Sequence, residues 1–288
     1  MRKLIILTLA FALPASAQEL ATTVKATEAA PGIYMLEGVD GFSSNIGLMV
    51  GDEHVLLIDN GMAPITASLV AKVKELSGRS VDYIVNTHGH GDHVGSNAAL
   101  AENGAVIFAH DNLRDALLEN LDYAGGPTGL PVVTFSDKVS FHANGHRAFV
   151  FHVPAAHTDG DSVIYFPDQN VIDASDLFFN SMFPFIDIDG GGSVAGFQEG
   201  QQRILDLADD DTVIIPGHGS IANKADLQSA LDMLIDAEAR VKKLVDEGMS
   251  EEQILEKNPL EDYHAQWNWG FITTERMTKT IYRSLTDG

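Results

Sequence analysis

The 288-residue sequence contains no cysteine. Disulfide bonds therefore cannot stabilise the fold, and a lipid anchor attached through an N-terminal cysteine is excluded. Any metal site in this chain must be built from histidine, aspartate and glutamate side chains, because thiolate ligands are absent. The hydrophobic core, or a bound metal, must supply the stability that disulfides give to many exported proteins.

Positively charged residues are few: 18 Lys and Arg stand against 41 Asp and Glu, which gives a formal net charge of −23. Such an acidic chain repels phosphate backbones and anionic lipid, so we expect neither nucleic acid nor a membrane surface as a partner. Solubility is another reason for an acidic composition. We expect a small-molecule substrate, and the sequence does not indicate an oligomeric state.

The apolar run Leu4–Leu13 is too short to span a membrane as a stable anchor. It follows a basic start (RK) and precedes the small-residue sequence ASA, an order typical of a cleaved secretory signal peptide. A buried N-terminal helix is the alternative, but Pro14 does not fit it. We therefore expect residues 1–17 to be a signal peptide and the mature protein to be periplasmic. Residues 18–288 would form a single domain with a helical C-terminal segment.

Strands and helices alternate along the mature chain. Short apolar segments bounded by Gly, Asp or Asn predict strands at 33–36, 46–50, 55–58, 81–85, 106–109, 131–135, 138–142, 147–153, 162–166, 171–172 and 212–215. Helical patterns are found at 64–76, 94–102, 111–120, 194–207 and in most of the segment after residue 223. The alternation indicates an α/β domain in which helices cover the faces of sheets.

The sequence THGHGDH (residues 87–93) directly follows a predicted strand. In extended backbone His88 and His90 point the same way, so both rings can bind one cation. The chain should then turn into a helix, which would direct Asp92 and His93 to a different side. This separation favours two adjacent metal positions, and the intervening glycines leave room for the ions. A loop that binds no metal is the alternative.

Three further polar residues follow predicted strands: His157, Asp176 and His218. Loops after strands gather at one edge of a sheet, where sites form. We expect one ion to be held by His88, His90 and His157, a second ion by Asp92, His93 and His218, and Asp176 to bridge them. Turn or helix-cap roles are the alternatives for the three later residues. Asp59, in LLIDNG, is either a turn residue or a hydrogen-bond partner of a metal ligand.

The ordered set HxHxDH (88–93), His157, Asp176 and His218 in PGHG resembles the metallo-β-lactamase superfamily. The stretch LLIDNG is similar to that family's early strand-to-Asp motif, and the resemblance spans about residues 33–220. It implies a four-layer αββα sandwich of the α/β class, with the metal site along one edge of two packed sheets. It also implies two zinc ions and hydrolysis as the usual chemistry.

Histidine and aspartate ligands make zinc the leading metal, with iron and manganese as alternatives. Two such ions roughly 3.5–4 Å apart would share a water and lower its pKa to about 7. The resulting bridging hydroxide would attack a carbonyl carbon. Asp92 would be both a ligand and the catalytic proton shuttle.

The chain departs from the B1 β-lactamases, which it otherwise resembles. That group carries cysteine where Asp176 stands, and usually lysine three residues later, where this chain has Phe179. Without that cation an acidic protein should bind anionic lactams weakly. We therefore expect an exported binuclear zinc hydrolase of cyclic amide or ester carbonyls, with β-lactam hydrolysis as a promiscuous activity. A glyoxalase II-like thioesterase or a lactonase is the alternative, and a periplasmic zinc-binding protein is the non-enzymatic one.

Several residues outside the ligand set are candidates for contact with substrate. Phe42, in VDGFSSN, resembles the flap of the B1 enzymes, although an ordinary turn is the alternative. Asn180 would donate to an oxyanion or serve as a turn residue. Trp267 and Trp269 would line an entrance or be partly buried in the core. In the helix predicted at 224–247, one face forms core or an oligomer contact and consists of Leu227, Leu231, Leu234 and Ile235.

Overall fold

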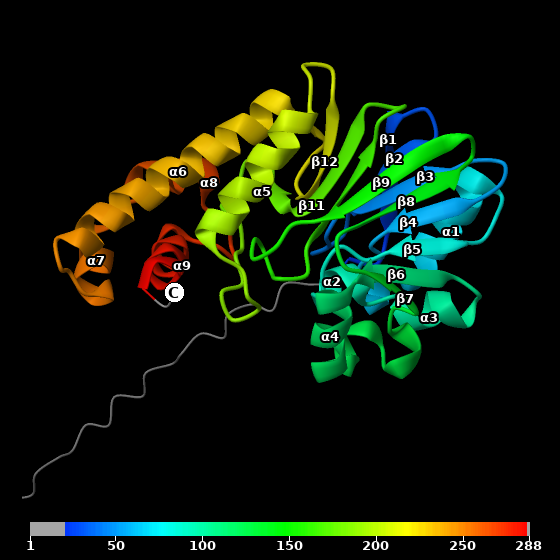
Figure 1. The fold of residues 1–288 in the computed structure, drawn as a ribbon, viewed down its shortest axis with the longest axis horizontal. Coiled ribbons are helices and arrows are strands. Elements are labelled where there is room, and N and C mark those ends of the chain that lie inside the picture. Colours follow the sequence, from blue (N-terminus) through cyan, green and yellow to red (C-terminus); the bar gives the residue numbers. More distant parts are fainter. Residues whose placement is uncertain (1–20, 287–288) are drawn as a thin grey trace, which may run out of the picture.

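A computed structural model describes residues 21–286 of the chain (Figure 1). The predicted signal peptide, residues 1–17, lies outside the described residues. Within residues 21–286, none of the helices combines the length and the apolar character that crossing a bilayer requires.

Two β-sheets form the centre of the structure. The first sheet has strand order β1-β2-β3-β4-β5-β6-β7 and contains β1 (Val24–Ala30), β2 (Ile33–Gly38), β3 (Ile46–Val50), β4 (Val55–Ile58), β5 (Tyr83–Val85), β6 (Val106–His110) and β7 (Val133–Phe135). The second has strand order β13-β12-β11-β10-β9-β8 and contains β8 (Lys138–Ala143), β9 (His146–His152), β10 (Ser162–Phe166), β11 (Val171–Phe179), β12 (Val213–His218) and β13 (Ala222–Asn223).

The helices lie outside these sheets (Figure 1). They are α1 (Thr66–Ser77), α2 (Gly91–Val94), α3 (Asn97–Glu102), α4 (Asp111–Glu119), α5 (Val194–Leu207), α6 (Lys224–Asp246), α7 (Glu251–Lys257), α8 (His264–Trp267) and α9 (Thr274–Thr286). Short 3₁₀ helices occur at η1 (Ala63–Ile65), η2 (Leu121–Ala124), η3 (Pro127–Gly129) and η4 (Glu261–Tyr263).

The two sheets pack face to face through an apolar layer. Buried side chains of the first sheet, such as Met35 and Leu56, meet Val150, Ile164 and Phe166 of the second. In a strand, alternate residues point to opposite faces, so the outward-facing residues of each sheet need a further cover. Both sheets therefore carry apolar residues on two faces, as near-continuous apolar strands predict.

Helices provide that cover on each side. Leu69 and Val73 of α1 pack against the outer face of the first sheet. On the second sheet, α5, α6 and α9 share one core cluster with β11, to which Phe197, Leu234 and Met277 contribute. The result is a four-layer αββα sandwich, which confirms the predicted fold class. The C-terminal helices belong to the outer layer of the second sheet.

Two strands are longer than predicted, and both carry candidate ligands. The strand expected to end before Asp176 continues as β11 to Phe179, and the strand expected to end before His218 includes it as β12. The two strands pair in parallel, with register shifts on either side of Ser175, whose φ is 44°. Pairing between β11 and β12 thus gives strand structure to polar segments that the sequence pattern had placed in loops.

Two helix predictions also need correction. The helix expected at 94–102 is divided into α2 and α3, because Gly95 packs directly against the backbone of Met62 and Ala63. On α6, Leu227, Leu231 and Leu234 are buried, but Ile235 is 48% exposed and does not belong to that core face.

Candidate metal centre

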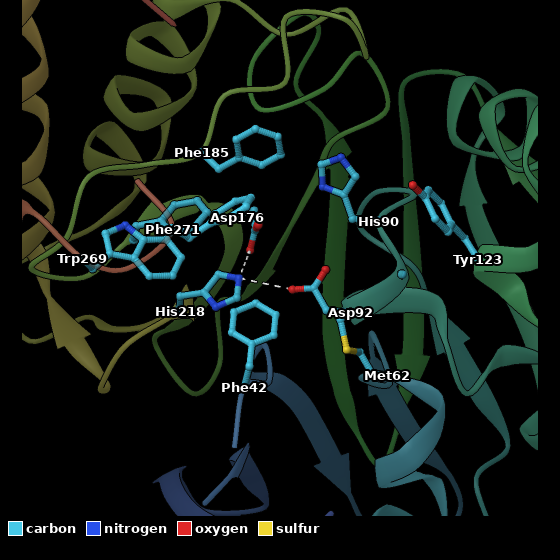
Figure 2. A pocket seen from close by; sticks show the side chains of 12 residues that line it. Phe42, Met62, His90, Asp92, Tyr123, Asp176, Phe185, His218, Trp269 and Phe271 are labelled. Atoms are coloured by element: carbon cyan, nitrogen blue, oxygen red, sulfur yellow. Dashed lines mark ion pairs between the residues drawn. The ribbon is translucent and has the colours of Figure 1, made fainter. Parts of the chain in front are cut away.

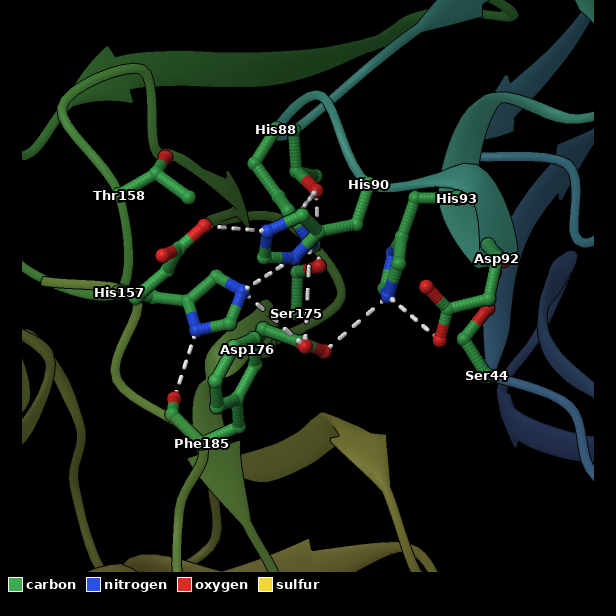
Figure 3. Close-up of polar contacts among 12 residues, drawn as sticks. Ser44, His88, His90, Asp92, His93, His157, Thr158, Ser175, Asp176 and Phe185 are labelled. Atoms are coloured by element: carbon green, nitrogen blue, oxygen red, sulfur yellow. Dashed lines mark hydrogen bonds and ion pairs between the residues drawn. The ribbon is translucent and has the colours of Figure 1, made fainter. Parts of the chain in front are cut away.

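The structure brings all seven predicted ligands together at one edge of the sandwich. Figure 3 labels all of them except His218, which is labelled in Figure 2. Their side chains form two groups, in each of which one potential ligand atom per residue lies within 4.8 Å of the others. The first group is His88, His90, His157 and Asp176, and the second is Asp92, His93 and His218. The loop before α2 supplies His88 and His90, and α2 supplies Asp92 and His93. The other three come from the loop after β9 (His157), from β11 (Asp176) and from the end of β12 (His218).

In the first group, hydrogen bonds fix which ring nitrogens are free. His157 Nδ1 donates to the carbonyl oxygen of Phe185 over 2.7 Å, and His90 Nε2 donates to Asp187 Oδ2 over 3.0 Å. The remaining nitrogens, His157 Nε2 and His90 Nδ1, then present lone pairs to one another across 3.0 Å. Two facing lone pairs repel unless a cation or proton lies between them, so this geometry fits a metal ion.

In the second group, Asp59 orients His93. Asp59 Oδ2 accepts from His93 Nδ1 over 2.7 Å, while its Oδ1 accepts from the backbone N–H of Thr87 over 2.8 Å. Asp59 has a φ of 60°, a left-handed conformation that aspartate tolerates better than most residues. Of the two alternatives for Asp59, the contact with His93 is therefore present, and the Nε2 atom of His93 is directed at the second group.

Asp176 lies between the groups. Its Oδ2 is 3.4 Å from His157 Nε2 and 3.8 Å from His88 Nε2, whereas its Oδ1 is 3.2 Å from His93 Nε2 and 3.6 Å from His218 Nε2. One carboxylate oxygen thus faces each group, as a bridging ligand requires. Glycine is needed at Gly217, because a Cβ there would lie 1.9 Å from Asp176 Oδ1.

Several buried donor and acceptor atoms of the centre make no hydrogen bond within the described part of the chain. They include His88 Nε2, His93 Nε2 and Asp176 Oδ1. Buried polar atoms without partners are costly, and most are satisfied by protein, water or an ion. Imidazole and carboxylate donors suit zinc, and they also accept iron or manganese. The residues present therefore fit the metal centre that the sequence pattern implies.

The electrostatics of the two groups differ. Burial lowers the pKa of His157 to about 4 and holds the pKa of His88 well below its ordinary value, so both imidazoles are neutral ligands at pH 7. Burial opposes ionisation of Asp92, but His93 and His218 outweigh it and lower the pKa of Asp92 to about 2. Burial likewise opposes a charge on His218, yet Asp176 and Asp92 raise its pKa to about 9. The field that attracts a proton to the second group would equally attract a divalent cation.

Sequence reasoning missed the residues that support the ligands. Asp187 and the carbonyl of Phe185 come from a loop about 30 residues beyond His157, and neither stands in a recognisable motif. Asn45 was missed as well. Its side-chain amide donates to the carbonyls of Pro216 and Gly219, both 2.8 Å away, and so holds the end of β12 that carries His218. A lone Asp or Asn among many polar residues gives no signal that distinguishes it.

The centre opens into a cavity of about 420 Å³ (Figure 2). Phe42 lines it, with its ring stacked 5.6 Å from that of His218 at an interplanar angle of 20°. Trp269 also lines the cavity, whereas Trp267 is buried in the core. Asn180 is not among the lining residues. Its amide instead donates to the carbonyl of Ser220 over 3.0 Å, so the structure gives it the turn role and not the predicted contact with an oxyanion.

Comparison with known proteins identifies the same superfamily that the sequence pattern resembles. The family model for the metallo-beta-lactamase superfamily matches residues 39–218, more than half of the chain. Among solved structures, a metallo-beta-lactamase from Pontibacter korlensis is similar with a TM-score of 0.64 and 20% identity, over 74% of this chain and 99% of that one. A sec-alkylsulfatase from Pseudomonas sp. is similar with a TM-score of 0.71 and 16% identity, over 91% of this chain and 50% of that one.

Curated relatives include two hydroxyacylglutathione hydrolases. The enzyme of Pelagibacter ubique is 31% identical over 118 residues, which is 41% of this chain and 44% of that protein. The match thus spans less than half of that relative's length. Hydroxyacylglutathione hydrolase GloC of Haemophilus influenzae is 28% identical over 192 residues, which is 63% of this chain and 88% of that protein. The family model's match covers more than half of the chain and includes every predicted ligand, so the chain belongs to the metallo-β-lactamase superfamily.

Proposed function

We propose that this protein is an exported hydrolase that holds two zinc ions and cleaves an ester, lactone, thioester or cyclic amide at its carbonyl group. The observation that carries the proposal is the arrangement of free donor atoms. The lone pairs of His90 and His157 converge from one side, and Asp176 presents one oxygen to each ligand group. Export rests on the N-terminal sequence alone, and it would place the enzyme in the periplasm.

Zinc bound by these residues would polarise a carbonyl and provide a hydroxide nucleophile at neutral pH. The protein's own contribution is orientation. Asp59 fixes the ring of His93, Phe185 fixes that of His157, and Asp187 fixes that of His90. Fixed ligands hold the reacting groups in place without reorganisation during the reaction.

Asp92 is the residue we assign to proton transfer. Its Oδ2 is 3.5 Å from His218 Nε2, and the other oxygen points away from His218 toward the lined cavity (Figure 2). A carboxylate with one oxygen beside the ligands and one beside the substrate can accept a proton from the nucleophile and pass it to the leaving group. Ser44 supports this position, because its hydroxyl donates to the backbone carbonyl of Asp92.

Thioester hydrolysis is favoured by those curated relatives that are named hydroxyacylglutathione hydrolases, whereas two others are named metallo-beta-lactamases. β-Lactam hydrolysis is favoured by Phe42, which covers the site from an early hairpin. Against a role in metal storage alone, the centre borders a cavity of about 420 Å³, a size typical of small-molecule sites. We therefore rank hydrolysis above a zinc-binding function.

The test combines metal analysis with a substrate panel. Zinc-loaded protein should contain about two zinc ions per chain and should hydrolyse at least one of p-nitrophenyl acetate, a γ-lactone, a lactoyl thioester or nitrocefin. His90→Ala and Asp92→Ala should each reduce that rate by at least about 100-fold. His146→Ala is the matched control, because that histidine is 45% exposed and lies outside the centre. Unchanged rates in Asp92→Ala, or retained zinc without turnover of the whole panel, would contradict the proposal.

A further inference from the structure

The cavity beside the metal centre has an aromatic wall. Its apolar lining comes from separate parts of the chain and consists of Phe42, Met62, Tyr123, Phe179, Phe185, Trp269 and Phe271. Among the described residues, no Lys or Arg lines this cavity. The charged lining groups, Asp92 and Asp176, are both assigned to the centre. A substrate that enters therefore meets apolar side chains on several sides of the metal ligands (Figure 2).

Part of this wall lies beyond the residues that match the family. Trp269 and Phe271 belong to the segment between α8 and α9, more than 50 residues after His218, where the family match ends. Their rings lie 5.7 Å apart, and Trp269 is 6.2 Å from the ring of His218. The C-terminal segment of this chain thus reaches the metal ligands directly.

The two rings are held in place. Trp269 Nε1 donates to the carbonyl of Phe183 over 2.9 Å, which directs the indole along the cavity. The guanidinium of Arg276 stacks 4.0 Å from the ring centre of Phe271 and 5.3 Å from that of Phe185, and it donates to the carbonyl of Phe271 over 3.2 Å. This cation supports the wall and is not a lining residue. The wall is therefore preorganised.

The mouth of the cavity exposes apolar surface. Phe271 is 43% exposed and Tyr123 is 47% exposed, on opposite sides of the ligands (Figure 2). Large aromatic side chains left in water at a cavity mouth are typical of a surface that a ligand covers. Covering them removes apolar area from water, which favours binding of an apolar group.

We infer that Trp269 and Phe271 select an uncharged substrate with an apolar acyl chain or aryl group next to the scissile carbonyl, within the hydrolase function proposed above. A carboxylate on that group would be desolvated against aromatic rings without a side-chain cation to pair with it. Neutral esters and lactones fit this site, whereas substrates that carry an anionic group beside the reacting carbonyl do not.

Binding can be tested separately from catalysis, because the sequence has two tryptophans and one lines the cavity. In Trp267→Phe protein, the emission of Trp269 should shift or be quenched on titration with 2-decanone, a neutral compound that cannot be hydrolysed. 9-Oxodecanoate keeps the methyl ketone but carries a carboxylate at the far end of the chain, against the aromatic wall, and it should bind at least about tenfold more weakly. Equal responses to both compounds, or none to either, would overturn the inference.

Catalytic selectivity is the second readout. Zinc-loaded wild-type protein should hydrolyse p-nitrophenyl octanoate with a kcat/KM on the order of tenfold or more above that for the acetate. Trp269→Ala and Phe271→Ala should each reduce this ratio about three- to tenfold, while zinc content stays at the wild-type value. Ile235→Ala, which removes an exposed apolar side chain far from the cavity lining, should leave the ratio unchanged.

The two proposals fail in distinguishable ways. If no ester, lactone, thioester or lactam is hydrolysed but 2-decanone still binds, the hydrolase function is wrong. The inferred preference of the aromatic wall for an uncharged apolar group is then still supported. The opposite result is hydrolysis of the acetate and the octanoate with equal kcat/KM, and the same ratio in the Trp269→Ala and Phe271→Ala variants. In that case the inferred selectivity of Trp269 and Phe271 is wrong, and the hydrolase function stands.

Discussion

At the scale of single residues, the short segment from Phe185 to Asp187 determines the chemistry of the first ligand group. The carbonyl of Phe185 accepts from His157, the carboxylate of Asp187 accepts from His90, and the backbone N–H of Asp187 donates to the carbonyl of His157 over 2.9 Å. Two of these hydrogen bonds set the tautomers of His157 and His90, and the third fixes the backbone of His157. Loss of such a partner typically lowers metal affinity or activity about 10- to 100-fold.

Replacement of Asp187 should therefore weaken zinc binding. Asp187→Ala leaves His90 free to rotate and to change tautomer, and we expect zinc affinity to fall about 10- to 100-fold. Asp187→Asn keeps an acceptor and should restore part of the loss. Competition with a chromophoric chelator measures both.

Asp189→Ala is the control for this measurement. Asp189 lies in the same loop, its side chain is 81% exposed, and it pairs with Arg283 over 2.6 Å instead of with a ligand. Its replacement should leave zinc affinity unchanged. Equal affinity in Asp187→Ala and wild type would show that the contact does not position His90.

A pair of stacked histidines outside the centre predicts a pH effect on stability. The rings of His110 and His152 lie 3.6 Å apart and nearly parallel, and His152 Nδ1 donates to the carbonyl of Asp161. Burial, then the neighbouring His110 and Arg203, lowers the pKa of His152 in the folded state, although Asp159 opposes this. Below a pH of about 6.5 the unfolded chain therefore takes up a proton that the folded chain does not, and stability falls as the pH falls.

Thermal unfolding between pH 8 and pH 5 checks this expectation. The Tm of His152→Phe should fall less steeply below pH 6.5 than that of wild type, because phenylalanine keeps the ring stack and removes the titrating group. Its Tm at pH 8 can be lower without affecting the comparison, since only the slope is informative. Parallel curves for the two proteins would assign the pH dependence to other groups.

At the scale of elements, the sequence predicted most strands and missed the feature that places the bridging ligand. The strands at 46–50, 55–58 and 162–166 have the predicted bounds, because each is a short apolar run between turn residues. Strand β11 does not follow this rule: its polar segment around Ser175 is buried and pairs with β12 through a shifted register. A strand built from polar residues is stabilised by the strand it pairs with. The local sequence pattern does not reveal which distant strand that is.

The helix that covers the second sheet begins with a defined cap. The side chain of Asn223 accepts from the backbone N–H groups of Ala225 and Asp226, and the side chain of Asp226 accepts in return from the N–H of Asn223. Asn223→Ala should lower the free energy of unfolding by about 1 kcal/mol, whereas Asn223→Ser should lose much less, because serine is also a good N-cap residue. Urea denaturation measures the difference. Equal losses in the two variants would show that the side-chain cap does not stabilise α6.

At the scale of the whole molecule, the two sheets and their helices bring together residues that are up to 130 positions apart. The ordered histidines and aspartates predicted which side chains lie together, because strand ends in a layered α/β fold meet at one edge. The cavity was less predictable: Trp269 and Phe271 come from a C-terminal segment whose path depends on the packing of α6, α8 and α9. Residue patterns predicted where the ligands meet, and tertiary packing determined what surrounds them.

Because the chain has no cysteine, its stability depends on the hydrophobic core and on any bound metal. A ligand that binds the folded state at 1,000 times its Kd adds about 4 kcal/mol to the free energy of unfolding. Removal of zinc with a chelator should therefore lower the Tm by several degrees, and zinc addition should restore it. Dithiothreitol should not lower the Tm any further, because the chain has no disulfide to reduce. A control is needed for the metal that dithiothreitol itself binds. A Tm that does not respond to chelation would show that the centre adds nothing to stability.

The central claim is that seven side chains form two adjacent metal positions bridged by Asp176. Anomalous diffraction at the zinc absorption edge, from crystals grown with zinc, tests it most directly. We predict two peaks roughly 3.5–4 Å apart, one about 2.0–2.2 Å from nitrogens of His88, His90 and His157 and one beside Asp92, His93 and His218. A single peak, or peaks outside these two groups, would contradict the account.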